Sequence, residues 1–433
     1  MKRDWDRNRD RETATAPGVV VFAHVPPPHH GQSYAVQLLL DRLRDPSSEA
    51  SKTNPLRVYH VDARLSDDIE AIGRFQPRKI LRLFRYCLQA IGFRLRRRAR
   101  VLYYIPAAPM RSAVYRDWLV MALCRPFFRK LVFHWEAAGL AEWLETSARP
   151  WERILTHLFL DRPTVSVVLA RHGRSDALAL RAHHVSVVPN GIPDPCPDFE
   201  TRLAPMRRDR RRRLADRTLT PAESRFRLLY LSLCIPEKGL FDAVDAVALA
   251  NAELAKAGES VRIELSVAGK FWRDEDRERF EARCRDADLQ LPLPPDASGS
   301  GGGSAGASSP AVIYRGFVDR ADKIGLFESS DAFVFPSYYA AESFGLALAE
   351  AMAFDLPCIA TRWRHIPEMF PESYPYLVDI QSPADIASLL ARLATGADPV
   401  PLRAHYLRHF TDQVYADGLR QALRLAANAE SVG

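Results

Sequence analysis

Two glutamates, Glu342 and Glu350, begin and end the segment ESFGLALAE, and their spacing suits the binding of a hydroxyl-rich ligand. An apolar run at 332–335 precedes the segment, and another at 357–361 follows it. The pattern predicts a strand, a helix and a second strand, with the glutamates at the strand-to-helix junction. Open α/β sheets bind ligands at such junctions, because helix N-termini present free N–H groups and the positive end of the helix dipole.

The spacing of the two glutamates limits the chemistry. On a single helix they would lie about 80° apart around the axis and roughly 12 Å apart along it. That distance is too long for two carboxylates that share a proton, and it exceeds the roughly 5 Å gap of a retaining glycosidase pair. The pair therefore suits two contacts along one elongated ligand. Spacing alone leaves an alternative open, in which one acid is solvated and the other is a helix-start acid stabilised by the dipole.

The residues around the glutamates occur in a characteristic order: Pro336-Ser337, Glu342 to Gly345, Glu350 to Ala353, and Thr361 through Pro367-Glu368. This order resembles the nucleotide-sugar half of GT-B glycosyltransferases, specifically the retaining glycosyltransferase family 4 (glycosyl transferases group 1). The resemblance implies that Glu350 accepts hydrogen bonds from the ribose hydroxyls and that Glu342 faces the transferred sugar. It also implies that four backbone N–H groups lie near sugar and phosphate: those of Ser343, Phe344, Gly345 and Leu346.

A second motif, PEKG at 236–239, joins a strand end to a helix start. A lysine there can place its ammonium on a diphosphate beside the helix N-terminus. The resemblance makes Lys238 the diphosphate clamp. Many family members have an arginine five positions earlier, where this chain has Leu233. The substitution leaves one phosphate-neutralising cation instead of two, unless another basic residue compensates.

Other positions match the family less specifically. Gly269 follows a strand-like run, where a glycine lets a nucleotide approach the backbone, although an ordinary turn glycine fits equally. Lys323 falls in a segment that resembles the one packed beside the base. In the first half, His30 and Gly31 resemble the glycine-rich first loop, which approaches the donor phosphate. His134, at the end of a strand, resembles the histidine near the sugar; a buried structural histidine is the alternative.

The alternation of strand and helix patterns predicts two doubly wound, Rossmann-like α/β domains that face each other across a cleft, as in the GT-B fold. The break falls at the Pro/Gly-rich segment after Val188, which resembles the family's VPNG hinge. The expected divisions are a disordered tail at 1–16, an acceptor-side domain at 17–190, a nucleotide-sugar domain at 191–410 with a flexible Gly/Ser loop at 298–309, and a helix at 411–433 that packs back on the first domain.

Composition limits the class of protein and its expected location. The chain has 433 residues, a net charge of +7 and six well-separated cysteines. Neither a transmembrane run nor a secretory signal is recognisable, and the cysteine spacing disfavours a zinc site or disulfide framework. A cytoplasmic protein is expected, and no Asp-x-Asp motif stands in a matching place, so neither a metal nor another cofactor is expected.

One stretch, Ala71 to Arg116, contains twelve Arg and Lys residues and no acid. Apolar residues at helical spacing make it a basic amphipathic segment. Three interpretations stay open: a core helix with a solvated face, a contact with an anionic membrane, and nucleic-acid binding, which the lack of any nucleic-acid motif disfavours.

These observations predict a retaining glycosyltransferase that moves a hexose from a nucleotide-sugar to a glycan or lipid-linked acceptor, with a role in cell-surface polysaccharide synthesis. The competing prediction is a GT-B scaffold that binds a nucleotide or a protein partner and transfers nothing; Leu233 and the altered first loop motivate it. A nucleotide-dependent oxidoreductase is disfavoured, because no G-x-G-x-x-G follows the first strand.

Overall fold

The computed structural model describes residues 16–27, 31–45, 52–64, 77–218, 220, 224–289 and 312–430. The predictions for His30, for residues 1–15, for the Gly/Ser loop at 298–309 and for residues 71–76 lie outside these ranges. The chain forms two compact units, Met1–Pro193 with His409–Gly433, and Asp194–Arg408. The sequence placed the two divisions after residues 190 and 410.

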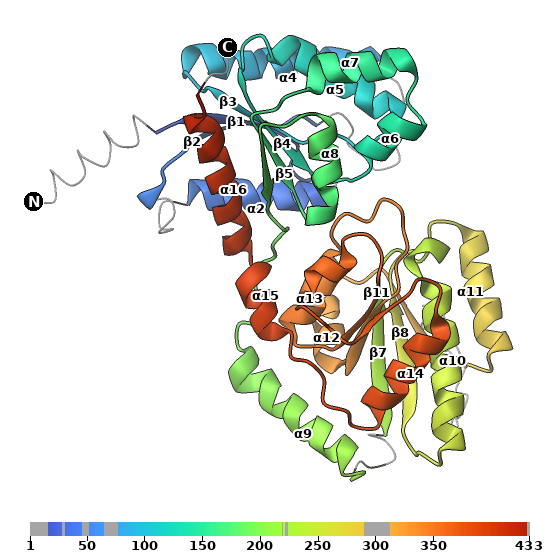
Figure 1. The fold of residues 1–433 in the computed structure, drawn as a ribbon. Helices are drawn as coiled ribbons and strands as arrows, with labels where there is room; N and C mark the ends of the chain where they lie inside the picture. The colour runs from blue at the N-terminus through green and yellow to red at the C-terminus, as the bar shows by residue number, and fades with distance from the viewer. Residues whose placement is uncertain are drawn as a thin grey trace, which may run out of the picture. The chain divides into compact units, whose positions relative to one another are not determined.

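The first unit is built on a six-stranded parallel sheet in the order β2-β1-β3-β4-β5-β6 (Figure 1). Its strands are β1 (Gly18–Phe22), β2 (Arg57–Val61), β3 (Val101–Tyr104), β4 (Lys130–Trp135), β5 (Val165–Val168) and β6 (His184–Val187). Its helices are α2 (Gly31–Arg44), α4 (Pro77–Arg96), α5 (Arg111–Cys124), α6 (Leu140–Thr146), α7 (Pro150–Leu160), α8 (Arg174–Ala179) and α16 (Asp412–Asn428), with a 3-10 turn at Arg171–Gly173.

Alternate residues of the central strands divide the core of this unit into two layers. Val20 and Phe22 belong to the cluster that includes side chains of α4, α5, α6 and α7. Val19 and Val21 belong to the cluster that includes side chains of α2 and α16. Because both faces of the sheet are covered, the strands are nearly continuous apolar runs, as parallel sheets require.

The last helix, α16, belongs to the first unit. Thr411 caps its N-terminus by accepting from Val414 N, and Asp412 forms an ion pair with Arg42 of α2. Tyr415 and Leu419 are buried on the sheet. Ala16, which the sequence assigned to the tail, is also buried here, and its carbonyl accepts a hydrogen bond from Arg57 Nε at 2.9 Å.

The second unit contains another six-stranded parallel sheet, in the order β12-β11-β10-β7-β8-β9. Its strands are β7 (Arg225–Leu231), β8 (Arg262–Ala268), β9 (Val312–Gly316), β10 (Ala332–Phe335), β11 (Cys358–Thr361) and the short β12 (Leu377–Val378). Its helices are α9 (Ala204–Ala215), α10 (Leu240–Lys256), α11 (Asp274–Asp286), α12 (Arg320–Ser329), α13 (Leu346–Ala353), α14 (Pro383–Ala394) and α15 (Arg403–His409). Single turns of 3-10 helix occur at Pro236–Lys238 and Ile366–Met369, and a π-helical turn at Phe199–Leu203 leads into α9.

The predicted α/β class and the two Rossmann-like sheets are therefore confirmed. Among the described residues, no helix has both the length and the apolar character that crossing a membrane requires. All six cysteines are free thiols buried in the two units.

Candidate functional site

The candidate donor site lies at the carboxyl ends of β7 and β10, which are neighbours in the second sheet. The loop after β7 contains Lys238, and the loop after β10 contains Glu342. Tyr338 N donates to the carbonyl of Glu237 at 2.8 Å and so joins the two loops. The sheet therefore brings together two motifs that are about a hundred residues apart in the chain.

Lys238 and Glu342 form an ion pair. The Lys238 ammonium donates to Glu342 Oε2 at 2.5 Å, and both side chains are largely buried. Ser337 Oγ donates to the same carboxylate oxygen at 2.9 Å. The lysine ammonium also lies 4.9 Å from the centroid of the Tyr339 ring. A largely buried ion pair of this kind suits an anionic and hydroxyl-rich ligand. The ammonium can neutralise a phosphate, and the carboxylate can accept hydrogen bonds from hydroxyl groups.

Glu350, like Glu342, forms an ion pair with a lysine. It lies within α13 and forms an ion pair with Lys323 of α12. The sequence left the role of Lys323 undefined and did not pair it with Glu350. Since α13 begins at Leu346, Glu342 stands in the preceding turn, so the one-helix geometry does not describe the two glutamates. Each glutamate is instead held by a lysine from a different loop or helix.

The N-terminus of α13 supplies backbone donors. Gly345 caps the helix in the left-handed conformation, with φ of 75°. Phe344 is buried, whereas Ser343 and Leu346 are half-buried. This turn therefore places the first N–H groups of the helix at the carboxyl end of β10, the geometry that binds anions at helix N-termini.

Gly239 permits the two loops to approach closely. Its φ is +74°, and a Cβ at this position would lie 2.1 Å from the carbonyl oxygen of Pro336. Gly269, at the end of β8, is equally constrained, because a Cβ there would lie 1.8 Å from the carbonyl oxygen of Ser232. The close approach at Gly269 is thus to the chain's own backbone, which supports the turn-glycine alternative without testing contact with a nucleotide.

Leu233 is half-buried in the loop after β7. The next residue, Cys234, donates its N–H to the carbonyl of Lys270 at 3.0 Å. Lys270 is an exposed residue just after β8, so this contact places the backbone of a basic residue beside the segment that lacks the arginine. Sequence spacing did not single out Lys270, because the link depends on the pairing between β7 and β8.

In the first unit, His134 is fully buried near the end of β4. The hydroxyl of Tyr103, on the adjacent strand, is hydrogen-bonded to His134 Nδ1 at 2.5 Å. Burial lowers the pKa of His134 to about 3, so the imidazole is neutral. The burial fits the structural alternative for this histidine, and its predicted contact with the sugar stays a prediction. Gly31, from the predicted first loop, is the first residue of α2.

Glu136 lies beside this histidine, and desolvation raises its pKa to about 7. Asn190, in the Pro-Asn-Gly segment, donates to Glu136 Oε2 at 3.0 Å. The carboxylate approaches His134 Nδ1 to 3.8 Å, which with a neutral imidazole is no ion pair. Among the described residues, four buried polar atoms of this cluster have no hydrogen-bond partner: His134 Nε2, Glu136 Oε1, Asn190 Oδ1 and Tyr415 Oη.

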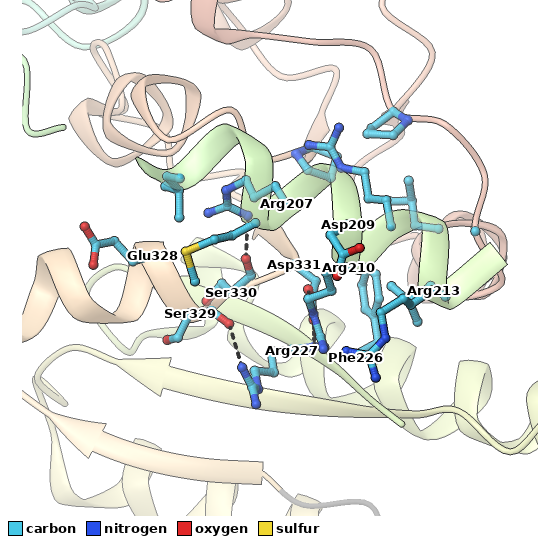
Figure 2. Close-up of a pocket in the computed structure, with 18 of the residues that line it drawn as sticks. Arg207, Asp209, Arg210, Arg213, Phe226, Arg227, Glu328, Ser329, Ser330 and Asp331 are labelled. Atoms are coloured by element: carbon cyan, nitrogen blue, oxygen red, sulfur yellow. Dashed lines mark hydrogen bonds and ion pairs between the residues drawn. The ribbon is translucent and has the colours of Figure 1, made fainter. Parts of the chain in front are cut away.

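A pocket of about 550 Å³ lies elsewhere in the second unit (Figure 2). It is lined by α9 and by residues next to the amino ends of β7 and β10, at the opposite end of the strands from Lys238. Its arginines are used in the fold: Arg207 donates to the carbonyls of Phe327 and Ser330, and Arg210 pairs with Asp331. These arginines therefore have a structural role, which is to attach α9 to the second sheet.

Residues 225–395 match the family model described as Glycosyl transferases group 1. The matched range begins at the first residue of β7 and ends just after α14, so it contains Lys238, Glu342 and Glu350. The Lys238–Glu342 and Lys323–Glu350 ion pairs thus both lie within the matched segment. No curated protein matches the chain in sequence.

Solved structures share the fold at low sequence identity. A structure of HepE from Anabaena in complex with UDP and glucose is 14% identical, has a TM-score of 0.57, and the match covers 94% of this chain and 99% of that one. Sucrose-phosphate synthase from Thermosynechococcus elongatus is 16% identical, with a TM-score of 0.58 and coverage of 94% and 98%. A glycosyltransferase from Rickettsia africae is 11% identical, with a TM-score of 0.61 and coverage of 95% and 100%. These likenesses establish the GT-B fold predicted from the sequence.

Proposed function

We propose that this protein is a retaining glycosyltransferase that moves a hexose from a nucleotide-sugar to a glycan or lipid-linked acceptor in cell-surface polysaccharide synthesis. The observation that supports this function most is the Lys238–Glu342 ion pair at the N-terminal end of α13, within the segment matched by the glycosyltransferase model. It combines a cation for a diphosphate with a carboxylate for sugar hydroxyls.

The proposed reaction needs positioning more than covalent chemistry. The nucleotide ribose binds Glu350, and the diphosphate lies at Lys238 and at the first N–H groups of α13. As the bond between the sugar and the diphosphate breaks, negative charge grows on the departing oxygen, and Lys238 and these N–H groups stabilise it. Glu342 orients the transferred sugar. No metal is assigned to this step.

Donor binding must rearrange the two ion pairs. Lys238 and Lys323 neutralise Glu342 and Glu350, respectively. A donor diphosphate draws the Lys238 ammonium toward phosphate, and ribose hydroxyls compete with Lys323 for the Glu350 carboxylate. The pairs hold both carboxylates near their working positions, which lowers the ordering cost of binding.

A chemical assay tests the function. UDP-sugars are tested first, since a fold neighbour is described in complex with UDP-glucose. Release of nucleoside diphosphate in the presence of an acceptor, with an α-linked product from an α-linked donor by NMR, supports retaining transfer. An inverted product would reject the retaining mechanism. Nucleotide binding with no turnover on any donor would instead favour the scaffold, which Leu233 motivates.

The location of the enzyme in the cell is also a proposal. A cytoplasmic enzyme that acts on a lipid-linked acceptor works beside a membrane, and the basic segment at 71–116 provides a surface for it.

A further inference from the structure

The helix α4 presents an apolar stripe to solvent. Leu81, Leu88 and Leu95 recur every seven residues and therefore lie on one side of the helix. Their exposed fractions are 74%, 68% and 63%. Phe84, on the same side, is also exposed. Exposing large apolar side chains to water is unfavourable, so a row of them marks a surface that contacts something apolar.

This stripe is distinct from the face that α4 turns to the core. Leu83, Cys87 and Ala90 of the same helix are buried against the first sheet. The sequence predicted an amphipathic helix here, and the structure shows that α4 has an inner apolar face and a second, outer one.

Arginines border the exposed stripe. Arg82 and Arg85 on the helix, and Arg96, Arg97 and Arg98 at its end, are all exposed. The segment 77–100 contains no acidic residue. Arg94, by contrast, is fixed to the fold, since its Nε donates to the carbonyl of Phe127 at 2.9 Å.

A second helix repeats the pattern. In α7, Trp151, Ile154 and Leu158 form an exposed row. Both α4 and α7 pack against α5 on the same side of the first sheet, opposite α2 and α16 (Figure 1). The acids of α5 and α7 are Asp117 and Glu152, and both are buried, so the outer faces of these three helices expose cations and apolar groups without an exposed acid.

We propose that the outer face of α4 lies on an anionic membrane, with Leu81, Leu88 and Leu95 among the acyl chains and the bordering arginines at the lipid phosphates. A second copy of this chain is a poor occupant, because the pairing would oppose two acid-free basic surfaces. A nucleic acid would use the arginines but would leave the leucines in water. An anionic lipid surface satisfies both groups, as it does for interfacial amphipathic helices.

Vesicle sedimentation with the full-length protein tests the proposal. The wild-type protein should sediment at low salt with vesicles of phosphatidylglycerol and phosphatidylcholine, and much less with phosphatidylcholine alone. High salt should release it, because exposed charges are screened. A wild-type chain that stays in the supernatant with anionic vesicles at low salt, or that binds neutral vesicles equally, overturns the proposal.

Two variants separate the apolar and the charged contributions. Replacing the three leucines by Gln should weaken binding to anionic vesicles by about tenfold or more, because each buried leucine contributes to partition. Replacing Arg85, Arg96 and Arg97 by Gln should weaken it to a similar degree and reduce its salt dependence. The controls change exposed residues of the same type elsewhere: Leu178, Leu249 and Leu425 for the leucine variant, and Arg208, Arg212 and Arg277 for the arginine variant. Either test variant binding as tightly as its control contradicts the proposal.

Two further readouts keep the result unambiguous. All substituted side chains are exposed, so melting temperatures near that of the wild type should show that the variants fold. Analytical ultracentrifugation without lipid should find the same oligomeric state in the wild type and the leucine variant; a wild-type dimer that the leucine variant loses would assign the stripe to a second copy and overturn the membrane proposal. Nucleotide binding should be unchanged in both variants, which separates a failure here from a failure of the proposed transfer reaction.

Discussion

The ammonium of Lys238 lies 2.5 Å from Oε2 of Glu342, and this contact joins the loop after β7 to the loop that precedes α13. Lys238 ends a single 3-10 turn and Glu342 precedes α13, so neither charged residue lies within a long helix or a strand. Substitutions at the two loops should therefore affect stability and turnover to different degrees.

Replacing Lys238 by Ala should cost about 2 kcal/mol of stability, because the buried Glu342 carboxylate loses a charged hydrogen bond. Turnover should fall by about a hundredfold or more, since the departing diphosphate loses its cation. Steady-state kinetics and thermal unfolding measure the two effects. The control is Lys256→Ala, at an exposed lysine of α10. Wild-type turnover in the Lys238 variant would contradict its role as the diphosphate clamp.

Replacing Gly239 by Ala tests the close approach of the two loops. Gly258 is a matched control, because its φ of +73° equals that of Gly239 within a degree but no atom lies within 4 Å of its would-be Cβ. Gly258→Ala should therefore cost only the left-handed strain, about 1 kcal/mol. Gly239→Ala adds a clash with Pro336 and should cost at least about 2 kcal/mol more. Equal losses in chemical denaturation would show that the loops separate easily.

Lys270 should compensate in part for the positive charge that is missing at Leu233. If the cation beside Cys234 helps to neutralise the donor phosphates, Lys270→Ala should weaken nucleoside diphosphate binding by about fivefold, the effect of one exposed charge. Leu233→Arg should restore the loss in the Lys270 variant. Calorimetric titration of both variants decides the matter, and an unchanged affinity in the Lys270 variant would remove it from the site.

Glu136 and His134 should give the first unit opposing responses to pH. Burial raises the pKa of Glu136 from 4.5 to about 7, so between these values the folded state binds more protons, and this group adds stability as pH falls. Burial lowers the pKa of His134 from 6.5 to about 3, so this group removes stability as pH falls below 6.5. The two effects oppose each other between about pH 4.5 and 6.5.

The variant Glu136→Gln removes the contribution of Glu136 to the pH dependence of stability and leaves that of His134. Its melting temperature relative to the wild type should be higher at pH 8 than at pH 5, because only the wild type gains stability by protonating this carboxyl. Thermal unfolding at both pH values tests the sign. A pH-independent difference would mean that Glu136 titrates normally in the folded protein.

Much of the fold could be predicted from local patterns. The apolar runs at 332–335 and 357–361 correspond to β10 and β11, and the segment between them contains the expected helix, α13. The short strand β12 was missed, because Leu377–Val378 is too brief to show a period.

The partners within the site could not be predicted, since they depend on contacts between distant segments. Lys323 of α12 pairs with Glu350 of α13, and β10 lies between these two helices in the chain. The spacing of the two residues in the sequence does not predict this contact. The burial of His134 depends on Tyr103 from a neighbouring strand and Tyr415 from the far end of the chain. The two apolar faces of α4 differ only in what packs against them, which hydrophobic periodicity does not report.

Calorimetric titration of nucleoside diphosphates tests the central claim most directly, with the wild type compared with Glu350→Ala and with Glu278→Ala, an exposed acid of α11, as control. At least one diphosphate should bind the wild type and the Glu278 variant equally. Its affinity for the Glu350 variant should fall by about tenfold or more, because the ribose loses a charged acceptor worth about 1.5–3 kcal/mol. Binding that is equally tight in all three proteins, or absent from the wild type for every diphosphate, would contradict a donor site at the carboxyl end of the second sheet.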